Sequence, residues 1–293
     1  MTDVIIIGGG PAGVSAALYT SRAGMGTTII HKDIGALEKA ERIDNYYGTP
    51  GQTGPDLINV GLEQAAKAGA DIITGEVVKI VLKFIDGHIH FQVETTGASF
   101  VAKTLLLATG ASRQAPNITG LANYEMKGVS YCAVCDAFFY KGKDVAVLGS
   151  SQYALSEAAE LLPHVNSLTI LTNGAEPDVT MPPEVSIRKE RITDIVGDTR
   201  LTGVTLEAAT LPLDGLFIAL GTAGATDLAR KLGAFVENNA VKVNANMQTN
   251  VPALWAAGDC TGGMKQIAKA VYEGAVAGTN IVRHLRENRN ETI

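Results

Sequence analysis

Two cysteines separated by two residues form the part of this chain best suited to chemistry. Cys132 and Cys135 lie in the stretch Tyr-Cys-Ala-Val-Cys-Asp at residues 131–136. Cysteines at i and i+3 can close a small disulfide at the start of a helix, where the helix N-terminus lowers a thiol pKa and favours the thiolate. Asp136 follows directly and places a carboxyl group where a proton must move whenever such a disulfide opens. The stretch therefore indicates a redox-active dithiol.

Half of a zinc site is the alternative interpretation of the same pair. Zinc normally takes four ligands, and the only other cysteine, Cys260, lies far along the chain. No histidine is close to the pair in the sequence. We therefore favour the redox interpretation and expect no metal site.

A glycine-rich turn near the N-terminus indicates that the chain binds a dinucleotide. Residues 4–7 are a continuous β-branched run, which is typical of a strand buried on both faces. The sequence Gly8-Gly9-Gly10-Pro11-Ala12-Gly13 follows, and residues 15–23 then predict a helix rich in small residues. In this setting Gly8 permits the turn, Gly10 lets the backbone approach a pyrophosphate, and Gly13 lets the helix pack on the strand. The helix N-terminus then faces the phosphates.

Two later strands end in residues that could complete the same site. Residues 104–107 predict a buried strand that ends in Ala108-Thr109-Gly110, and residues 254–257 predict another that ends in Gly258-Asp259. Asp259, at a strand end beside a glycine-rich helix start, suits a polyol hydroxyl. Asp33 is the first acid after the second predicted strand and is therefore the candidate for a ribose contact.

Composition limits the class of protein. The chain has 293 residues, enough for two domains, and combines 46% hydrophobic residues and 32 glycines with only 5% aromatics, which suits an α/β protein with tight turns. The net charge of −6 makes bulk attraction to nucleic acid unfavourable. No stretch is long enough to span a membrane and no secretory signal is visible, so we expect a cytoplasmic protein.

The order of these segments predicts an α/β fold with two Rossmann-like domains, each a three-layer βαβ unit. A second strand–turn–helix unit opens at residue 144. We expect a nucleotide-binding domain split into residues 1–115 and 244–293. Residues 116–243 would form the inserted domain, which carries the cysteine pair and a degenerate dinucleotide-binding-like fold.

Together these motifs resemble the low-molecular-weight thioredoxin reductases over nearly the whole chain. The residues that carry the resemblance are, in the family's order and spacing, Gly8-Gly9-Gly10-Pro11-Ala12-Gly13, Asn45, Ala108-Thr109-Gly110, Cys132-Ala133-Val134-Cys135-Asp136 and Gly258-Asp259. The resemblance implies a homodimer that contains FAD and reduces the disulfide of thioredoxin or a thioredoxin-like protein. The split domain would then be the FAD-binding domain.

The resemblance also implies roles for individual residues. Cys135 would face the flavin and receive its electrons, Cys132 would attack the disulfide of the partner, and Asp136 would donate and accept the proton. Asp259 would hold the ribitol of FAD, with Asn45 near the flavin. Gln266 and Ile267 would lie beside the isoalloxazine. The FAD-binding residues predicted in this way are Gly8, Gly10, Pro11, Ala12, Gly13, Asp33, Asn45, Ala108, Thr109, Gly110, Gly258, Asp259, Gln266 and Ile267.

The inserted domain departs from the family at its nucleotide site. The family binds NADPH there through a second glycine fingerprint and a loop that bears arginine, whereas this chain has Gly149-Ser150-Ser151-Gln152-Tyr153-Ala154. Ser151 puts a Cβ and a hydroxyl where close approach to a pyrophosphate needs glycine. The loop at residues 172–178 contains two acids and no arginine, so a 2′-phosphate would meet repulsion.

A subset of the family, the ferredoxin-dependent flavin thioredoxin reductases, is similar in lacking these motifs. We therefore expect ferredoxin rather than NADPH as the electron donor. The alternatives are an NAD(P)H-dependent thioredoxin reductase, with Glu176 on the ribose hydroxyls if the donor is NADH, a second flavin as donor, or an oxidase that passes electrons from a dithiol to oxygen. A redox-inert flavin-binding module is a further alternative, against which the intact cysteine pair and Asp136 count.

Overall fold

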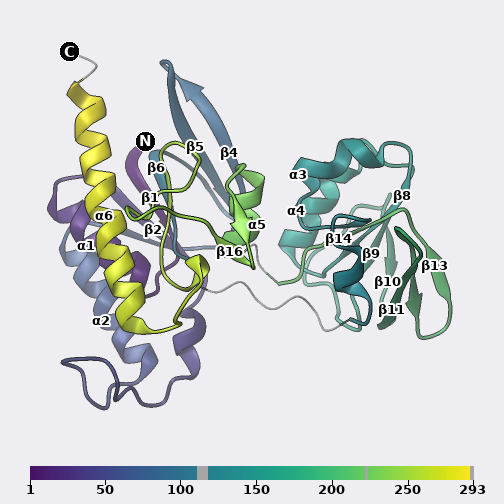
Figure 1. Cartoon of the computed structure of the whole chain (residues 1–293), viewed down its shortest axis with the longest axis horizontal. Helices are drawn as coiled ribbons and strands as arrows, with labels where there is room; N and C mark the ends of the chain where they lie inside the picture. The colour runs from purple at the N-terminus through teal and green to yellow at the C-terminus, as the bar shows by residue number, and fades with distance from the viewer. Residues whose placement is uncertain (111–117, 222–223, 291–293) are drawn as a thin grey trace. The chain divides into compact units, whose positions relative to one another are not determined.

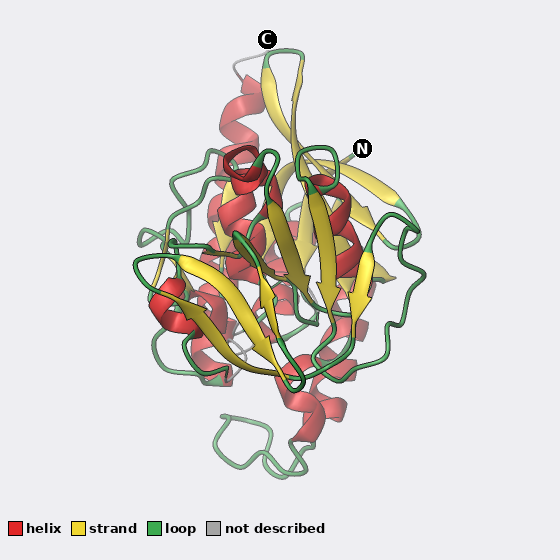
Figure 2. Ribbon diagram, turned by 90° about the vertical axis from the view of Figure 1, so that its right-hand side faces the viewer, coloured by secondary structure: helices red, strands yellow, loops and turns green. Residues whose placement is uncertain are grey.

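The chain folds into two units, each of which combines helices with mainly parallel sheets. The computed structural model describes residues 1–110, 118–221 and 224–290. Unit 1 contains residues 1–112 and 224–293, and unit 2 contains residues 113–223. The predicted α/β fold with two Rossmann-like parts is confirmed (Figures 1 and 2).

The chain returns to unit 1 earlier than predicted, at residue 224 rather than 244. Asn250 shows why residues 224–243 belong there. Its side-chain amide donates to the carbonyl of Gly233 at 2.9 Å and accepts the N–H of Phe235 at 2.8 Å. These bonds tie the returning segment to the last strand region of unit 1.

Unit 1 is built from one large mixed sheet with helices packed on it. Its helices are α1 (Pro11–Arg22), α2 (Gly54–Lys67), α5 (Ala225–Lys231) and α6 (Ile267–Asn290), with 3-10 turns η1 (Gly35–Lys39) and η4 (Asp259–Thr261). Its strands are β1 (Thr2–Ile7), β2 (Thr27–His31), β3 (Asp71–Thr74), β4 (Val77–Ile85), β5 (His88–Thr95), β6 (Ser99–Leu107), β15 (Val236–Glu237), β16 (Ala240–Val241) and β17 (Leu254–Ala256).

The sheet of unit 1 has the strand order β3-β2-β1-β6, all parallel, and then divides. The C-terminal half of β6 pairs in parallel with β17, while its N-terminal half pairs with the antiparallel hairpin β5–β4. The apolar runs in β1 and β6 are fully buried, as expected for central strands covered on both faces.

Small residues allow α1 and α6 to lie side by side (Figure 1). A Cβ on Gly274 would collide with the carbonyl of Ala12, and one on Gly278 would lie 2.7 Å from the carbonyl of Ala16. The Ser15 hydroxyl also donates to a carbonyl of α6 at 2.7 Å. This close packing fixes the start of α6 relative to the glycine turn that precedes α1.

Unit 2 contains a five-stranded parallel sheet and a three-stranded antiparallel sheet. Its helices are α3 (Ala133–Asp136) and α4 (Gln152–Leu161), with 3-10 turns η2 (Leu121–Tyr124) and η3 (Ala137–Tyr140). Its strands are β7 (Val129–Ser130), β8 (Asp144–Leu148), β9 (Ser167–Leu171), β10 (Ser186–Arg188), β11 (Ile192–Gly197), β12 (Leu201–Leu206), β13 (Thr210–Pro212) and β14 (Gly215–Ile218). The parallel sheet has the order β10-β9-β8-β14-β7, and the antiparallel sheet has the order β11-β12-β13. Within the described ranges, no helix has a stretch both long and apolar enough to cross a bilayer.

Candidate functional site

The turn between β1 and α1 leaves open space above a helix N-terminus. Gly8 has a left-handed φ of +115°, and a Cβ on it would collide with the carbonyl of Ala108. A Cβ on Gly13 would collide with the carbonyl of Gly8, so the helix can lie this close to the strand only with glycine there. At Gly10, by contrast, an added Cβ would meet no atom within 4 Å. Gly8 and Gly13 therefore serve the fold, whereas Gly10 keeps space free for a ligand.

The space at Gly10 has the features of a phosphate site. Gly10 is the N-cap of α1, Pro11 follows in the first turn, and no side chain caps this end. The N–H groups of the first turn therefore remain for an anion. At the end of β6, the Thr109 hydroxyl is buried and has no hydrogen-bond partner among the described residues. An uncapped glycine turn and an unpartnered buried hydroxyl both fit the pyrophosphate end of a dinucleotide.

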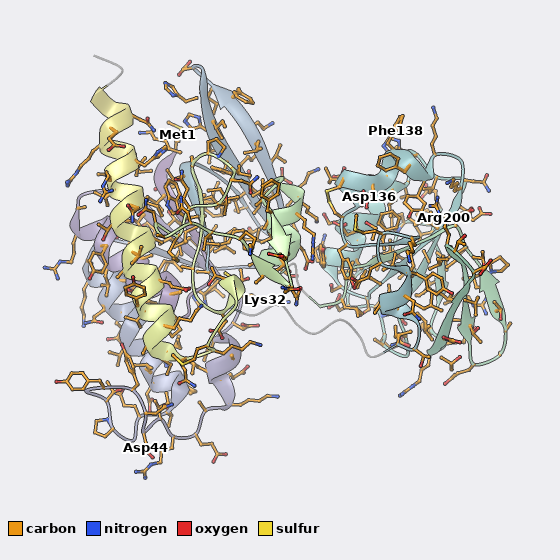
Figure 3. The ribbon with its side chains drawn as sticks, viewed as in Figure 1. Met1, Lys32, Asp44, Asp136, Phe138 and Arg200 are labelled. Atoms are coloured by element: carbon orange, nitrogen blue, oxygen red, sulfur yellow. A yellow bond between two sulfur atoms is a disulfide. The ribbon has the colours of Figure 1, made fainter. Side chains whose placement is uncertain are left out.

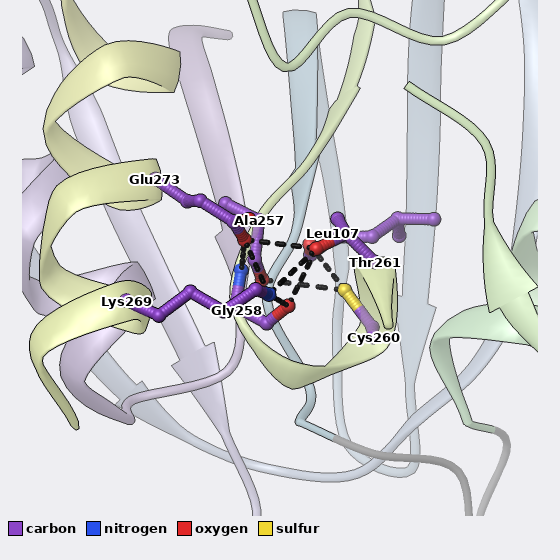
Figure 4. A network of polar contacts seen from close by, with 7 residues as sticks. All are labelled: Leu107, Ala257, Gly258, Cys260, Thr261, Lys269 and Glu273. Carbon is purple, nitrogen blue, oxygen red and sulfur yellow. Dashed lines mark hydrogen bonds and ion pairs between the residues drawn. The ribbon is translucent and has the colours of Figure 1, made fainter. Parts of the chain in front are cut away.

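An ion pair between the buried Glu273 and the partly buried Lys269 fixes the turn that leads into Asp259 (Figure 4). Glu273 is 8% exposed, and its Oε2 accepts hydrogen bonds from the Gly258 N–H at 2.8 Å and the Thr261 hydroxyl at 2.8 Å. The Lys269 ammonium donates to the same oxygen at 3.0 Å and to the Gly258 carbonyl at 2.9 Å. Both backbone groups of Gly258 are thus held by side chains of α6.

Asp259 lies in this turn with its carboxyl group partly buried. Desolvation raises the pKa of Asp259, while the nearby ammonium groups of Lys269 and Lys265 act in the opposite direction. Hydroxyl donors from a bound polyol would offset the desolvation of this carboxylate. The neighbouring Cys260 is fully buried, and burial raises the pKa of its thiol to about 12, so it is an unreactive core thiol.

Two residues that the sequence placed near a flavin meet in the structure although they are distant in the chain. Asn45 Nδ2 donates to Gln266 Oε1 at 3.0 Å. Gln266 directly precedes α6, which begins at Ile267. Asp33, by contrast, is exposed, and its carboxylate accepts the N–H of Gly35 at 2.9 Å within its own loop. The fold therefore joins Asn45 to the start of α6 and leaves Asp33 at the surface.

In unit 2, Cys132 and Cys135 form a disulfide at the start of α3. The S–S distance is 2.08 Å and the Cα–Cα distance is 5.3 Å. Cys132 is the N-cap of α3 and is 4% exposed, and its sulfur accepts the N–H of Cys135 at 3.1 Å. Cys135 itself is exposed. Across the part of the chain that the structure describes, no group of three or more His, Cys, Asp or Glu side chains could hold a metal ion.

Ser130 links Asp136 to the backbone of Cys132. The Ser130 hydroxyl donates to Asp136 Oδ2 at 2.7 Å and accepts the N–H of Cys132 at 3.1 Å. Ser130 is buried, whereas Asp136, labelled in Figure 3, is partly exposed at the end of α3. Asp136 is therefore close to the cysteine pair, but its connection runs through a serine that was not predicted from the sequence.

A buried glutamate beside the disulfide was also not predicted. Glu157 on α4 is 1% exposed, and its Oε2 accepts the N–H of Ala133 at 2.8 Å. Its neighbours on the same face of α4, Ala154, Ala158 and Leu161, are buried and apolar. A charged residue at an apolar-face position of a predicted helix is the signal that could have revealed it.

The turn between β8 and α4 has no open space at the position that corresponds to Gly10. Ser151 is 7% exposed, and its hydroxyl donates to the carbonyl of Gly221 at 2.6 Å. As at the first turn, a Cβ on the leading glycine, Gly149, would collide with a strand-end carbonyl, here that of Ala219. The second turn thus keeps the glycine that the fold needs and fills the position that a ligand needs.

The loop at residues 172–178 is less repulsive to an anion than its sequence suggested. Its Glu176 forms an ion pair with Lys189 at 2.5 Å. The Nε of Arg191 lies 3.4 Å from the position that an added Cβ on Gly174 would occupy. The loop itself contains no arginine, but the fold brings one to it from the segment just before β11.

The chain matches one family over most of its length. The family described as "Pyridine nucleotide-disulphide oxidoreductase" matches residues 2–274. A thioredoxin reductase from Aquifex aeolicus (strain VF5) is 34% identical, with 94% of this chain and 89% of that protein covered. The crystal structure of an atypical thioredoxin reductase from Desulfovibrio vulgaris Hildenborough is similar with a TM-score of 0.89 and 36% identity, covering 98% of this chain and 99% of that chain. A ferredoxin-flavin thioredoxin reductase from Clostridium acetobutylicum has a TM-score of 0.71 and 32% identity, with 98% of each chain covered.

These relationships also identify the cofactor. The family and its thioredoxin reductases are FAD-dependent flavoproteins, so the FAD predicted from the sequence is confirmed. The open turn at Gly10, the buried Thr109 hydroxyl and the partly buried Asp259 fit that group. The chain belongs to the pyridine nucleotide-disulphide oxidoreductase family and is a homologue of the thioredoxin reductases.

Proposed function

We propose that this protein is an FAD-dependent thioredoxin-disulfide reductase, which passes electrons through Cys132 and Cys135 to thioredoxin or a thioredoxin-like protein. The observation that carries the proposal is the Cys132–Cys135 disulfide, to which Asp136 is connected through Ser130. Thiol–disulfide exchange needs a thiolate that attacks and a group that moves the proton, and this cluster supplies both.

The two cysteines have environments that suit different steps of the exchange. FAD, when bound, supplies the electron pair. Cys135 is exposed and accepts the pair, while Cys132 leaves as a thiolate that the Cys135 N–H already faces at 3.1 Å. Asp136 takes up or returns the proton. Because Cys132 is buried in the disulfide form, the reduced pair must expose it before it attacks a partner.

Apolar side chains around the pair support a protein as the substrate. Val134, Phe138 and Phe139 are 53%, 74% and 69% exposed; Val134 lies between the two cysteines, and the two phenylalanines follow them in the chain. Figure 3 shows Phe138 at the outer edge of unit 2, near Asp136. Clustered exposed apolar groups mark protein–protein contacts, and thioredoxin would cover them in the mixed disulfide.

We propose ferredoxin rather than NADPH as the electron donor. The support is Ser151, whose bonded side chain occupies the position that a pyrophosphate would approach. Lys141 and Lys143 lie just after the cysteine pair, and neither has an ion pair among the described residues. An acidic ferredoxin would dock against these two lysines.

A second basic cluster near the loop at residues 172–178 suits such docking less well. Arg188 is paired with Glu190 at 2.6 Å, and Lys189 is paired with Glu176. These pairs neutralise two of its three cations and leave Arg191. The neutralised cluster therefore ranks below Lys141 and Lys143.

An NAD(P)H-dependent thioredoxin reductase is the second candidate, and Arg191 is the observation that favours it. Its guanidinium lies beside Gly174, in the loop where a nucleotide ribose would lie in a Rossmann-like unit. An oxygen-dependent dithiol oxidase is the third candidate, because the same cysteine pair can carry electrons in either direction.

We also propose that the protein is a homodimer, on its likeness to the thioredoxin reductases. Light scattering of the FAD-loaded protein at working concentration should give twice the mass of one chain, which is 30.6 kDa. A monomer would contradict the proposal.

The donor is tested by anaerobic stopped-flow mixing. The oxidised protein is mixed separately with reduced ferredoxin, NADPH and NADH, flavin bleaching is followed, and thioredoxin reduction is then measured with the same donors. Ferredoxin should bleach the flavin quickly, at a rate that falls with salt, and NADPH should not. Fast bleaching by NADPH, with none by ferredoxin, would show that the protein is a nucleotide-dependent reductase.

A further inference from the structure

We propose that Glu157 is a positioning residue that makes the Cys132–Cys135 pair a stronger reductant. The inference rests on the proposed function of that pair as the redox-active disulfide. Glu157 is not adjacent in sequence to the pair, and it reaches the pair only because α4 packs against α3. Its carboxyl group is almost fully buried, and Ala133, whose N–H it accepts at 2.8 Å, is fully buried.

The backbone N–H groups around the disulfide are divided among three acceptors. The Cys132 N–H donates to the Ser130 hydroxyl at 3.1 Å, and the Ala133 N–H donates to Glu157 at 2.8 Å. The Cys135 N–H donates to the sulfur of Cys132 at 3.1 Å. Of these three bonds, only the last one supports negative charge on sulfur.

This division bears on the reduced state of the pair. Reduction breaks the S–S bond and leaves two sulfur atoms that hold two more electrons and up to two protons. Amide donors stabilise a thiolate on Cys132, and a nearby carboxyl group disfavours it. A disulfide whose reduced form is stabilised is a stronger oxidant. Glu157 acts in the opposite sense, because it engages the Ala133 N–H and places a carboxyl group one residue from Cys132.

A less stable reduced form of the cysteine pair suits a reductase. A pair that must deliver electrons to another disulfide works better when its own reduced form is not stabilised. Glu157 also keeps the Ala133 amide satisfied in the core, which a cysteine sulfur could do only weakly. One buried carboxyl group thus sets the driving force while it completes the hydrogen bonding of the segment.

The test is the redox equilibrium of the pair in the Glu157→Gln variant. The FAD-loaded full chain is equilibrated anaerobically with mixtures of dithiothreitol and its cyclic disulfide, so that dithiothreitol supplies two electrons and two protons. Cys132 and Cys135 are then alkylated and counted by peptide mass spectrometry. We expect the variant's equilibrium constant for reduction to rise about tenfold, which corresponds to a potential about 30 mV more positive for a two-electron couple.

Controls separate this effect from a structural one. Glu160→Gln makes the same change on the same helix at a partly exposed position and should leave the equilibrium unchanged. If Glu157→Gln does not fold, Glu157→Asp retains the carboxyl group but draws the oxygen away from Ala133, and a smaller shift in the same direction is expected. An equilibrium equal to that of the original protein, or shifted the other way, would overturn the inference. A pair that dithiothreitol cannot reduce reversibly even in the original protein would instead refute the proposed function.

Discussion

The two units share one strand order, and they differ in what occupies the corresponding places. The parallel strands run β3-β2-β1-β6-β17 in unit 1 and β10-β9-β8-β14-β7 in unit 2. The glycine turn before α1 therefore corresponds to the turn before α4, and the end of β17 corresponds to the end of β7. The chain reaches the outer strand at opposite stages, because β17 is the last strand of unit 1 and β7 is the first strand of unit 2.

The ends of these two outer strands carry the candidate chemistry of each unit. β17 leads into Gly258 and Asp259, and β7 leads into the cysteine pair. A buried glutamate accepts a backbone N–H at 2.8 Å in both places: Glu273 from Gly258, and Glu157 from Ala133. The comparison shows that the fold determines where a reactive group is presented, while the residues there determine which chemistry it does.

The two glycine turns show that a binding position can be closed without a change of fold. In both turns the leading glycine avoids a strand-end carbonyl, which is a requirement of the fold. At the ligand-facing position, the N-cap backbone is extended in both turns, with φ of −76° at Gly10 and −106° at Ser151. Since any residue adopts these angles, a serine at this position costs the backbone nothing while it removes the space that a ligand would need.

The largest expected effect is that of substitutions in the cysteine pair of unit 2, compared with a substitution of the single thiol of unit 1. Cys132→Ser and Cys135→Ser should each lower thioredoxin reduction by a factor of order a thousand or more, because each removes one half of the disulfide. Cys132→Ser should still let Cys135 perturb the flavin spectrum, whereas Cys135→Ser should break electron flow from the flavin. Steady-state reduction with a physiological donor, together with flavin spectra, measures both effects.

Cys260→Ser is the matched control for the pair. The Cys260 thiol donates to the carbonyls of Ala257 and Leu107, bonds that a serine hydroxyl can also make, so activity should be retained. Full activity of Cys135→Ser would show that the division of roles between the pair is wrong.

The next effect tests the ligand-facing position of unit 1. Gly10→Ala adds a Cβ to open space, so the protein should fold normally but bind FAD about a hundredfold more weakly, since the pyrophosphate loses its close backbone contact. Flavin affinity by fluorescence titration and the midpoint of urea unfolding of the flavin-free protein measure the two properties. Gly8→Ala should behave in the opposite way and lower stability first, because its Cβ would meet the Ala108 carbonyl. Equal loss of stability in both variants would contradict the distinction between Gly8, which the fold requires, and Gly10, which keeps space for the ligand.

A smaller effect is expected at the end of β17. Burial raises the pKa of Asp259 in the flavin-free protein, so the stability of the folded state falls as the pH rises from the unfolded-state pKa through that raised pKa. Asp259→Asn should therefore gain stability relative to the original protein as the pH rises from about 4 to 7, while its FAD affinity falls about tenfold. Urea unfolding of both flavin-free proteins across this pH range tests the first part. A stability difference that shrinks or reverses as the pH rises would contradict it.

The sequence was sufficient to predict the parts of the molecule that follow from local rules. A β-branched run before a glycine fingerprint predicted β1 and α1, and cysteine spacing predicted the disulfide. The cofactor followed from the same turn and from the resemblance, which brought in Asn45 and Gln266 before the fold joined them.

What could not be predicted depends on contacts between distant segments. The hydrogen bond of Glu157 to Ala133 exists only because the fold places α4 there, and Arg191 joins the loop at residues 172–178 only through the fold. The return of the chain to unit 1 at residue 224 was also not predicted. Asn250 attaches that segment by hydrogen bonds to Gly233 and Phe235, and no local sequence pattern predicts these bonds.

The smallest expected effect tests whether one side chain separates the two turns. Ser151→Gly removes the bond to Gly221 and adds backbone freedom, so the free energy of unfolding should fall by about 1–2 kcal/mol. The space that opens should raise the rate of flavin reduction by NADPH only about three- to tenfold, because Ala154 still replaces the last glycine of the fingerprint. The ion pair between Glu176 and Lys189 would also still occupy the loop at residues 172–178, where the ribose of a nucleotide would lie. Ser150→Gly makes the same chemical change one residue earlier and should leave the NADPH rate unchanged. A Ser151→Gly variant that NADPH reduces as fast as ferredoxin does would show that this single serine, and not the loop, closes the second turn to nucleotides.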